Sequence, residues 1–193
     1  MSKANRITLS AGGALVILLV VGLAVFALRD RGGGSTLAGL QTGPAPWPSD
    51  DIGLTDRMHE IGVPFSDMEG TALHIHPQLW VFVGGTHVPV PASIGIEPSG
   101  ETMAALHTHD DSGIIHDESP VVRSYSLGEF FDVWGVRLTR TCVGGYCATG
   151  DKRLAALVDA RPFTGDPRDI PLRNGENIVL AYGTNAEIAK ATR

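Results

Sequence analysis

Basic residues are few in this sequence. The 193 residues include 15 Lys and Arg against 21 Asp and Glu, and the formal net charge is −6. Four basic residues and one acidic residue precede position 36, so the remainder carries 11 basic and 20 acidic side chains. Proteins that bind nucleic acids neutralise phosphates with clustered Lys and Arg, and the sequence has no basic stripe of that kind. The composition therefore argues against a nucleic-acid partner.

Familiar catalytic motifs are also absent from the sequence. It contains no glycine-rich phosphate loop, no His-Glu-x-x-His pair and no Gly-x-Ser-x-Gly turn. It has no internal repeat at the period of solenoid proteins. No motif assigns a reaction, so the sequence leaves open whether the chain is an enzyme.

Cysteine is scarce, with only Cys142 and Cys147 in the stretch TCVGGYC. Two cysteines that flank a Gly-Gly turn in an oxidising compartment predict a disulfide across a tight loop. A dithiol site for a soft metal is the alternative.

One long uncharged run is present, ITLSAGGALVILLVVGLAVFAL at residues 7–28. At about 1.5 Å per residue it is long enough to cross about 30 Å of hydrocarbon, which predicts one transmembrane helix. A cleavable signal peptide is the alternative, although its apolar region is usually about 7–15 residues and no Ala-x-Ala site precedes RDRGGG. The basic residues in 1–6 favour a cytoplasmic N-terminus and an extracytoplasmic C-terminal domain.

The remaining chain divides into a linker, a domain and a tail. Residues 29–51 are rich in Gly and Pro and predict a linker. Apolar runs punctuated by turns indicate a globular domain at 52–185, and 186–193 is predicted to be a C-terminal tail. The expected location is the cell membrane, as a single-pass protein with a membrane-protein partner.

An α+β fold is predicted for the domain. QLWVFV and THVPVPA flank a Gly-Gly turn, which indicates a hairpin whose prolines suit an edge strand. Ser126 and Glu129 form a capping-box pattern, which predicts a short helix ending at Gly135. Two more strands joined by an Asn-Gly turn are expected in the last third. This order favours a small mixed sheet with one short helix, β-grasp-like, over a compact β-barrel or sandwich.

Five of the seven histidines lie in two short clusters. In a strand, residues i and i+2 point to the same face, so each His-x-His can place two ring nitrogens around one point. A Ser-Gly turn can fold the last histidine back onto the second pair. Three or four such nitrogens are the usual ligands of zinc and copper. The sequence therefore predicts one copper or zinc ion, held by ligands from His74, His76, His107, His109 and His116.

Carboxylates accompany the second cluster. Acidic side chains commonly accept the second ring N–H of a ligating histidine, although one of them is alternatively a direct ligand. The residues predicted to orient the histidines in this way are Asp110, Asp111, Asp117 and Glu118. Without a metal, the same residues would form a hydrogen-bonded network that titrates near neutral pH. His59 and His87 are isolated and are interpreted as surface or core side chains.

Several of these motifs resemble a group of bacterial membrane-anchored proteins whose activity is not established. The stretches LHIHPQLWVFVGG, LHTHDDSGIIHDESP, YSLGEFFDVWGVRL and CVGGYC carry this resemblance over about residues 70–183, and Leu106 to Pro120 is its most specific part. It implies that the two His clusters, the helix and the Cys loop belong to one domain. The first His-x-His also resembles the copper-binding pair of copper-zinc superoxide dismutase, but the rest of that family's pattern is missing.

Three functions are compatible with these features. The first is an extracytoplasmic metal-binding protein that delivers, buffers or senses copper or zinc, and copper is preferred because it heads the divalent affinity order. The second is a metalloenzyme, in which a histidine-bound zinc or copper ion with an open position activates water. The third is a metal-free interaction scaffold whose His/Asp cluster responds to pH.

Overall fold

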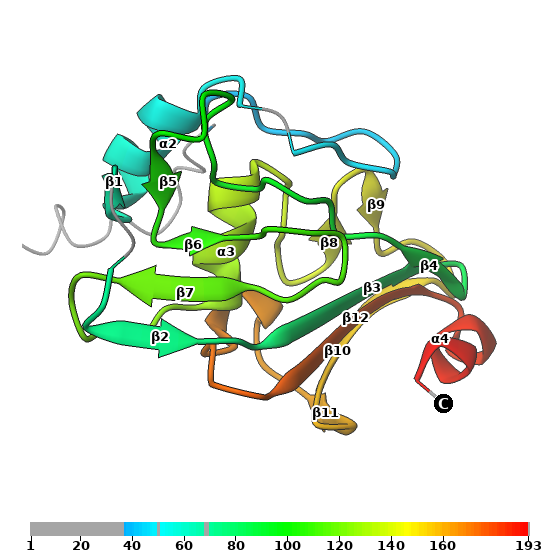
Figure 1. Cartoon of the computed structure of the whole chain (residues 1–193). Helices are drawn as coiled ribbons and strands as arrows, with labels where there is room; N and C mark the ends of the chain where they lie inside the picture. The colour runs from blue at the N-terminus through cyan, green and yellow to red at the C-terminus, as the bar shows by residue number, and fades with distance from the viewer. Residues whose placement is uncertain (1–36, 50, 68–69, 193) are drawn as a thin grey trace, which may run out of the picture. The chain divides into compact units, whose positions relative to one another are not determined.

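The structure is a computed structural model that describes residues 37–49, 51–67 and 70–192 (Figure 1). The predicted transmembrane helix at 7–28 lies outside these ranges. Within them, no helix combines the length and the apolar character needed to cross a membrane.

The larger sheet has five strands in the order β11-β10-β12-β3-β4. The central strands β12 and β3 run parallel although they come from distant parts of the chain, and each other neighbouring pair is antiparallel. Alternation explains the burial of β3, because Leu79 and Val81 are fully buried while Trp80 is exposed on the other face. The five strands are β3 (Gln78–Val83), β4 (Thr86–Val88), β10 (Arg153–Val158), β11 (Arg161–Phe163) and β12 (Asn177–Gly183).

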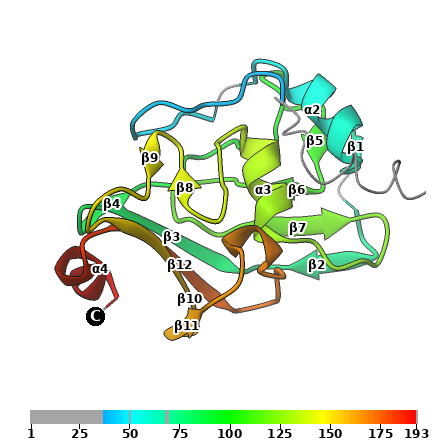
Figure 2. The same cartoon turned by 180° about the vertical axis from the view of Figure 1, so that it is seen from behind.

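A second, three-stranded antiparallel sheet has the order β2-β7-β6. Its strands β6 and β7 lie beside the central helix α3 in both views (Figures 1 and 2). The strands of this sheet are β2 (Leu73–Ile75), β6 (Leu106–His107) and β7 (His116–Ser119). Two short strand pairs complete the described β structure: β1 (Phe65–Ser66) with β5 (Met103–Ala104), and β8 (Cys142–Val143) with β9 (Tyr146–Cys147).

The central helix α3 (Leu127–Trp134) begins and ends where the sequence predicted. The Ser126 hydroxyl accepts a hydrogen bond from the Glu129 backbone N–H, and the Glu129 carboxylate accepts one from the Ser126 N–H. Gly135 then ends the helix in the left-handed conformation, with φ of 72°. Phe130, Phe131 and Trp134 are buried in the core, so this short helix is stabilised by packing as well as by its caps.

The prediction of a single helix in the domain was too low, because the described residues contain two more α-helices and one 3-10 helix. These are α2 (Leu54–Ile61), α4 (Asn185–Ala191) and η1 (Pro167–Asp169). The start of α2 has no side-chain cap, since its N-cap is Gly53. By contrast, α4 has a complete capping box of Thr184 and Glu187, a signal that was present in the sequence. This helix occupies most of the predicted tail and packs beside β12.

Two turn predictions had different outcomes. The hairpin at Gly84-Gly85 is confirmed, since Val83 pairs with Thr86, and β4 lies at the sheet edge. The strand is shorter than predicted, because it ends at Val88, before the two prolines. The Asn174-Gly175 turn does not join two neighbouring strands directly; it follows η1 and leads into β12. The hairpin that follows β10 instead turns at Asp159-Ala160, both with positive φ, a turn that lacks the usual glycine.

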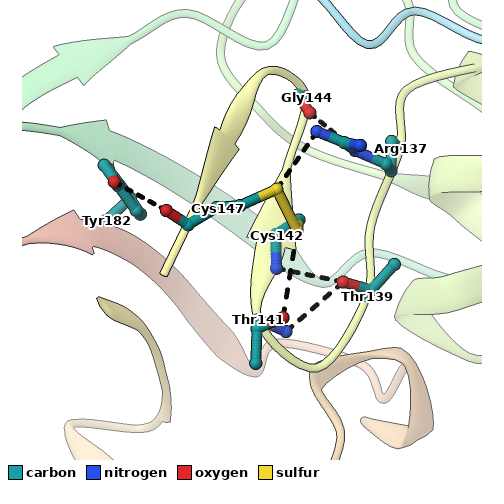
Figure 3. The surroundings of a disulfide bond; sticks show 7 residues. All are labelled: Arg137, Thr139, Thr141, Cys142, Gly144, Cys147 and Tyr182. Carbon is teal, nitrogen blue, oxygen red and sulfur yellow. Dashed lines mark hydrogen bonds between the residues drawn. A yellow bond between two sulfur atoms is a disulfide. The ribbon is translucent and has the colours of Figure 1, made fainter. Parts of the chain in front are cut away.

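The second half of the predicted linker packs on the domain. The Gln41 backbone N–H donates to the Gly135 carbonyl, and Trp47 is only 2% exposed. The Trp47 ring lies against the β8–β9 hairpin, where an added Cβ on Gly144 would come within 2.2 Å of it. That hairpin contains the predicted Cys142–Cys147 disulfide, which is confirmed (Figure 3). The described chain is thus a mixed α+β domain with several sheets.

Candidate metal centre

The middle strand β7 and its two neighbours align four candidate side chains on one face of the small sheet. His116 and Glu118 are two residues apart on β7 and therefore point to the same side. Across the ladder, His107 is directly opposite His116 and His74 is directly opposite Glu118. Directly opposed residues have neighbouring side chains, so this register gathers all four.

The turn after β2 positions His76. Its backbone N–H donates to the Asn174 side-chain oxygen over 3.0 Å, and its carbonyl accepts from the Gly175 N–H over 3.1 Å. The Asn174-Gly175 turn, which was predicted to join two strands, instead anchors a candidate ligand. This role has no local sequence signal, because Asn174 and His76 are distant in the chain.

Buried Thr108 anchors the segment between the second pair of histidines. Its hydroxyl donates to the Pro91 carbonyl over 2.8 Å and accepts from the Ile94 N–H over 3.0 Å. Thr108 is fully buried, so this segment has a defined position. Sequence reasoning did not identify Thr108, because its partners lie in a separate loop.

The predicted turn that returns the chain to His116 is present at Ser112-Gly113. The Gln78 side-chain amide donates to the Ser112 carbonyl over 2.6 Å, and the Leu79 N–H donates to the Gly113 carbonyl. Gly113 has φ of 82°, and a Cβ there would lie 2.4 Å from the Leu79 oxygen. Glycine is therefore required for the loop to approach β3 this closely.

The two His-x-His pairs meet in space. Nε2 of His74 lies 3.2 Å from Nε2 of His76, which is 3.1 Å from Nδ1 of His116. In the second pair, Nε2 of His107 lies 3.1 Å from Nε2 of His109. The His116 ring stacks on that of His107, with centroids 5.4 Å apart, and meets that of His109 edge-on at 4.4 Å. The sequence could not show this convergence.

Glu118 lies among these rings. One carboxylate oxygen, Oε1, is 3.0 Å from His116 Nδ1 and 3.4 Å from His74 Nε2. The other, Oε2, is 3.8 Å from His107 Nε2, and it is a buried atom with no hydrogen-bond partner among the residues that the structure describes. The side chain is only 5% exposed. A buried carboxylate oxygen aimed at ring nitrogens, beyond hydrogen-bond distance, suits a direct metal ligand.

Burial favours the neutral forms of His107 and His76. It lowers the pKa of His107 to about 4, despite the opposing effects of the Ala104 carbonyl and Glu118. It also lowers the pKa of His76, and the neighbouring His116 and His74 act in the same direction. Burial alone would raise the pKa of Glu118, but the hydrogen bond from His116 and the nearby imidazoles lower it overall. Neutral imidazole and ionised carboxylate are the forms that bind metals.

The other three predicted carboxylates lie elsewhere. Asp110 is exposed and accepts a hydrogen bond from the Ser112 N–H, and its bonds to Ser112 lower its pKa. Asp111 is also exposed. Asp117 falls between two residues of the cluster on β7, so its side chain points to the opposite face, where it is fully buried. Of the isolated histidines, His87 is exposed and contacts the rings of Trp80 and Phe82.

The donor geometry fits a first-row transition metal. Two ligands about 2.0–2.1 Å from a tetrahedral zinc ion lie roughly 3.3 Å apart, close to the spacings found between these nitrogens. His107 donates Nδ1–H to the Ala104 carbonyl over 2.9 Å, which leaves Nε2 free to ligate and fixes the ring. The side chains form two sets, and within each set the ligand atoms all lie within 4.8 Å of one another. The first set is His107, His109, His116 and Glu118, and the second is His74, His76 and Glu118, so Glu118 belongs to both.

The cluster can therefore hold a metal ion, and its donor set of nitrogens with one carboxylate suits zinc, copper, iron or nickel. Comparison of the chain with protein-family models, with curated proteins and with solved structures finds no match.

Proposed function

We propose that the chain is a membrane-anchored, extracytoplasmic protein that binds copper or zinc through histidines and delivers, buffers or senses the metal. The observation that carries this proposal is the convergence of five imidazoles and one buried carboxylate on a single cluster. Their backbones are held by a strand ladder and by hydrogen bonds from distant segments. A site that is built in advance of binding loses little conformational entropy when the ion enters.

Other features support the metal and the location. Imidazole suits both ions, and copper stands ahead of zinc because Cu(II) heads the affinity order of the divalent metals. The apolar run at 7–28 supports a membrane anchor. The disulfide supports an oxidising compartment outside the cytoplasm.

The strand order supports a β-grasp-like classification as part of the same proposal. Two antiparallel pairs, β3 with β4 and β10 with β12, form the order β4-β3-β12-β10 in the sheet. Of these four strands, β3 is the first in the chain and β12 is the last, and the two lie parallel at the centre of the sheet. The helix α3 lies between the two units in the chain. A mixed sheet packed around one helix is the arrangement on which the β-grasp-like prediction is based.

Metal content and thermal stability test the binding function. The full-length chain is purified without a histidine tag, analysed for metals and melted in Cu(II), Zn(II) or EDTA. An ion at a hundred times its Kd stabilises the folded state by about 2.7 kcal/mol. For a domain of this size, Tm should then rise by roughly 5–10 °C.

Paired variants assign the ligands. His107→Ala/His109→Ala should lose both bound metal and the rise in Tm, whereas His59→Ala/His87→Ala removes two histidines outside the cluster and should keep them. Wild-type affinity in His107→Ala/His109→Ala would contradict the ligand assignment. No metal and no shift in the wild-type chain would contradict metal binding and favour the pH-responsive network.

A water-activating metalloenzyme is the second candidate, and the exposure of one side of the cluster favours it. His74 is 57% exposed and His76 is 38% exposed, so water and a small substrate can reach an ion bound there. A metal ion with an open position lowers the pKa of bound water toward about 7. Metal-dependent hydrolysis of an activated ester, lost in His74→Ala/His76→Ala and kept in His59→Ala/His87→Ala, would support this role.

A further inference from the structure

We infer that the cluster binds two metal ions rather than one, with Glu118 as the bridging ligand. This inference rests on the proposed metal-binding function and adds the number of ions and their arrangement. Six side chains converge, which is more than the four ligands that zinc takes in structural sites. Two ions that share one carboxylate would use all six.

The two oxygens of Glu118 face different sets of ring nitrogens. Oε1 lies 3.4 Å from Nε2 of His74 and 3.9 Å from Nε2 of His76. Oε2 lies 3.8 Å from Nε2 of His107. A carboxylate that binds one ion with each oxygen holds the pair at the spacing of about 3.5–4 Å typical of two-metal centres.

The unpaired oxygen distinguishes this arrangement from a single ion at the first pair. If Glu118 bound only an ion at His74 and His76 through Oε1, Oε2 would remain a buried oxygen without a hydrogen-bond partner among the described residues, which is unfavourable. An ion held by His107 and His109 would supply its partner. His116 lies between the two sets, because Nδ1 is 3.1 Å from His76 Nε2 while its ring contacts both His107 and His109.

Burial makes the two positions unequal. The inner position is formed by His107, which is fully buried, with His109 and His116. The outer position is formed by His74 and His76, which are 57% and 38% exposed. The inner ion should therefore bind more tightly and exchange slowly, and the outer ion should exchange readily with solvent. A protein that passes a metal to a partner needs one ion that can leave.

Titration of the full-length chain with Cu(II), and separately with Zn(II), tests the inference. Bound metal is counted by elemental analysis after gel filtration, and the copper form is examined by electron paramagnetic resonance. Two ions per chain are expected, with the isolated-ion copper spectrum at the first equivalent. At the second equivalent, the spectrum should show the broadening and half-field signal of two coupled Cu(II) ions. The wild-type titration alone separates one ion from two.

Variants then locate the second ion. His74→Ala/His76→Ala changes exposed side chains and should bind one ion, with an uncoupled copper spectrum. Glu118→Gln keeps the shape of the side chain, and it should weaken the second ion by about tenfold or more and abolish the coupling. The control His59→Ala/His87→Ala should keep two coupled ions.

The outcomes separate the two proposals. One equivalent in the wild-type chain, or two equivalents without coupling, would overturn the bridged pair and leave the metal-binding function intact. Two ions retained in His74→Ala/His76→Ala would overturn the outer position. No bound metal at all would overturn both proposals.

Discussion

Replacement of Asp117 by Asn should stabilise the domain at neutral pH. Asp117 lies on the middle strand β7, fully buried on the face opposite the histidines. Neither of its carboxylate oxygens has a hydrogen-bond partner among the described residues. Burial raises its pKa from 3.8 to about 7, with Glu129 adding to the effect and Arg123 opposing it. Asn has the same shape and does not ionise.

The raised pKa determines both the sign and the size of the effect. The folded chain holds this proton more tightly than the unfolded chain does. The stability associated with the proton is therefore present below pH 3.8 and is lost as the pH rises toward about 7. At about 1.4 kcal/mol per pKa unit, the loss reaches up to about 4 kcal/mol. Asp117→Asn avoids this loss. Its free energy of unfolding should therefore exceed that of the wild type by roughly 2–4 kcal/mol above neutral pH and equal it near pH 4.

Urea unfolding at several pH values, with EDTA present, measures this difference. His107 contributes in the opposite direction, because its lowered pKa of about 4 causes stability to be lost as the pH falls below 6.5. That contribution is common to both chains and cancels in their difference. Asp111→Asn changes an exposed carboxylate and should show no comparable pH-dependent gain. A difference between Asp117→Asn and the wild type that stays constant across the pH range would refute the reasoning.

Three further changes probe the frame around the cluster. Ser126→Ala removes the N-cap of α3 and should cost about 1 kcal/mol in urea unfolding, and the exposed Ser124→Ala should cost nothing comparable. Gly144→Ala places a Cβ 2.2 Å from the Trp47 ring and should lower Tm. Gly150 has a similar φ but open space around it, so Gly150→Ala should have a clearly higher Tm than Gly144→Ala. Equal Tm values for the two variants would contradict the contact with Trp47. Cys142→Ser/Cys147→Ser opens a short loop and should cost about 2 kcal/mol by chain entropy. Metal content should not change in that variant, and a loss of metal would show that the hairpin supports the site.

Local signals were sufficient for several elements. The capping box of Ser126 and Glu129 and the terminal Gly135 define α3, because caps act through backbone groups of their own turn. The Gly-Gly pairs define two hairpins for the same reason. The capping box of α4 was equally local but was not identified in the sequence. The transmembrane helix at 7–28 stays a prediction.

What the sequence by itself determined is the set of candidate ligands: two His-x-His pairs and a nearby histidine, because residues two apart on a strand share a face whatever their neighbours. Only the tertiary structure decided that the pairs meet. The ladder that places His74 opposite Glu118 joins distant segments, and its register depends on packing across the whole domain. The same register places Glu118 among the rings and Asp117 in the core. A shift of one residue would exchange them, and no local pattern in the sequence determines which of the two carboxylates reaches the histidines.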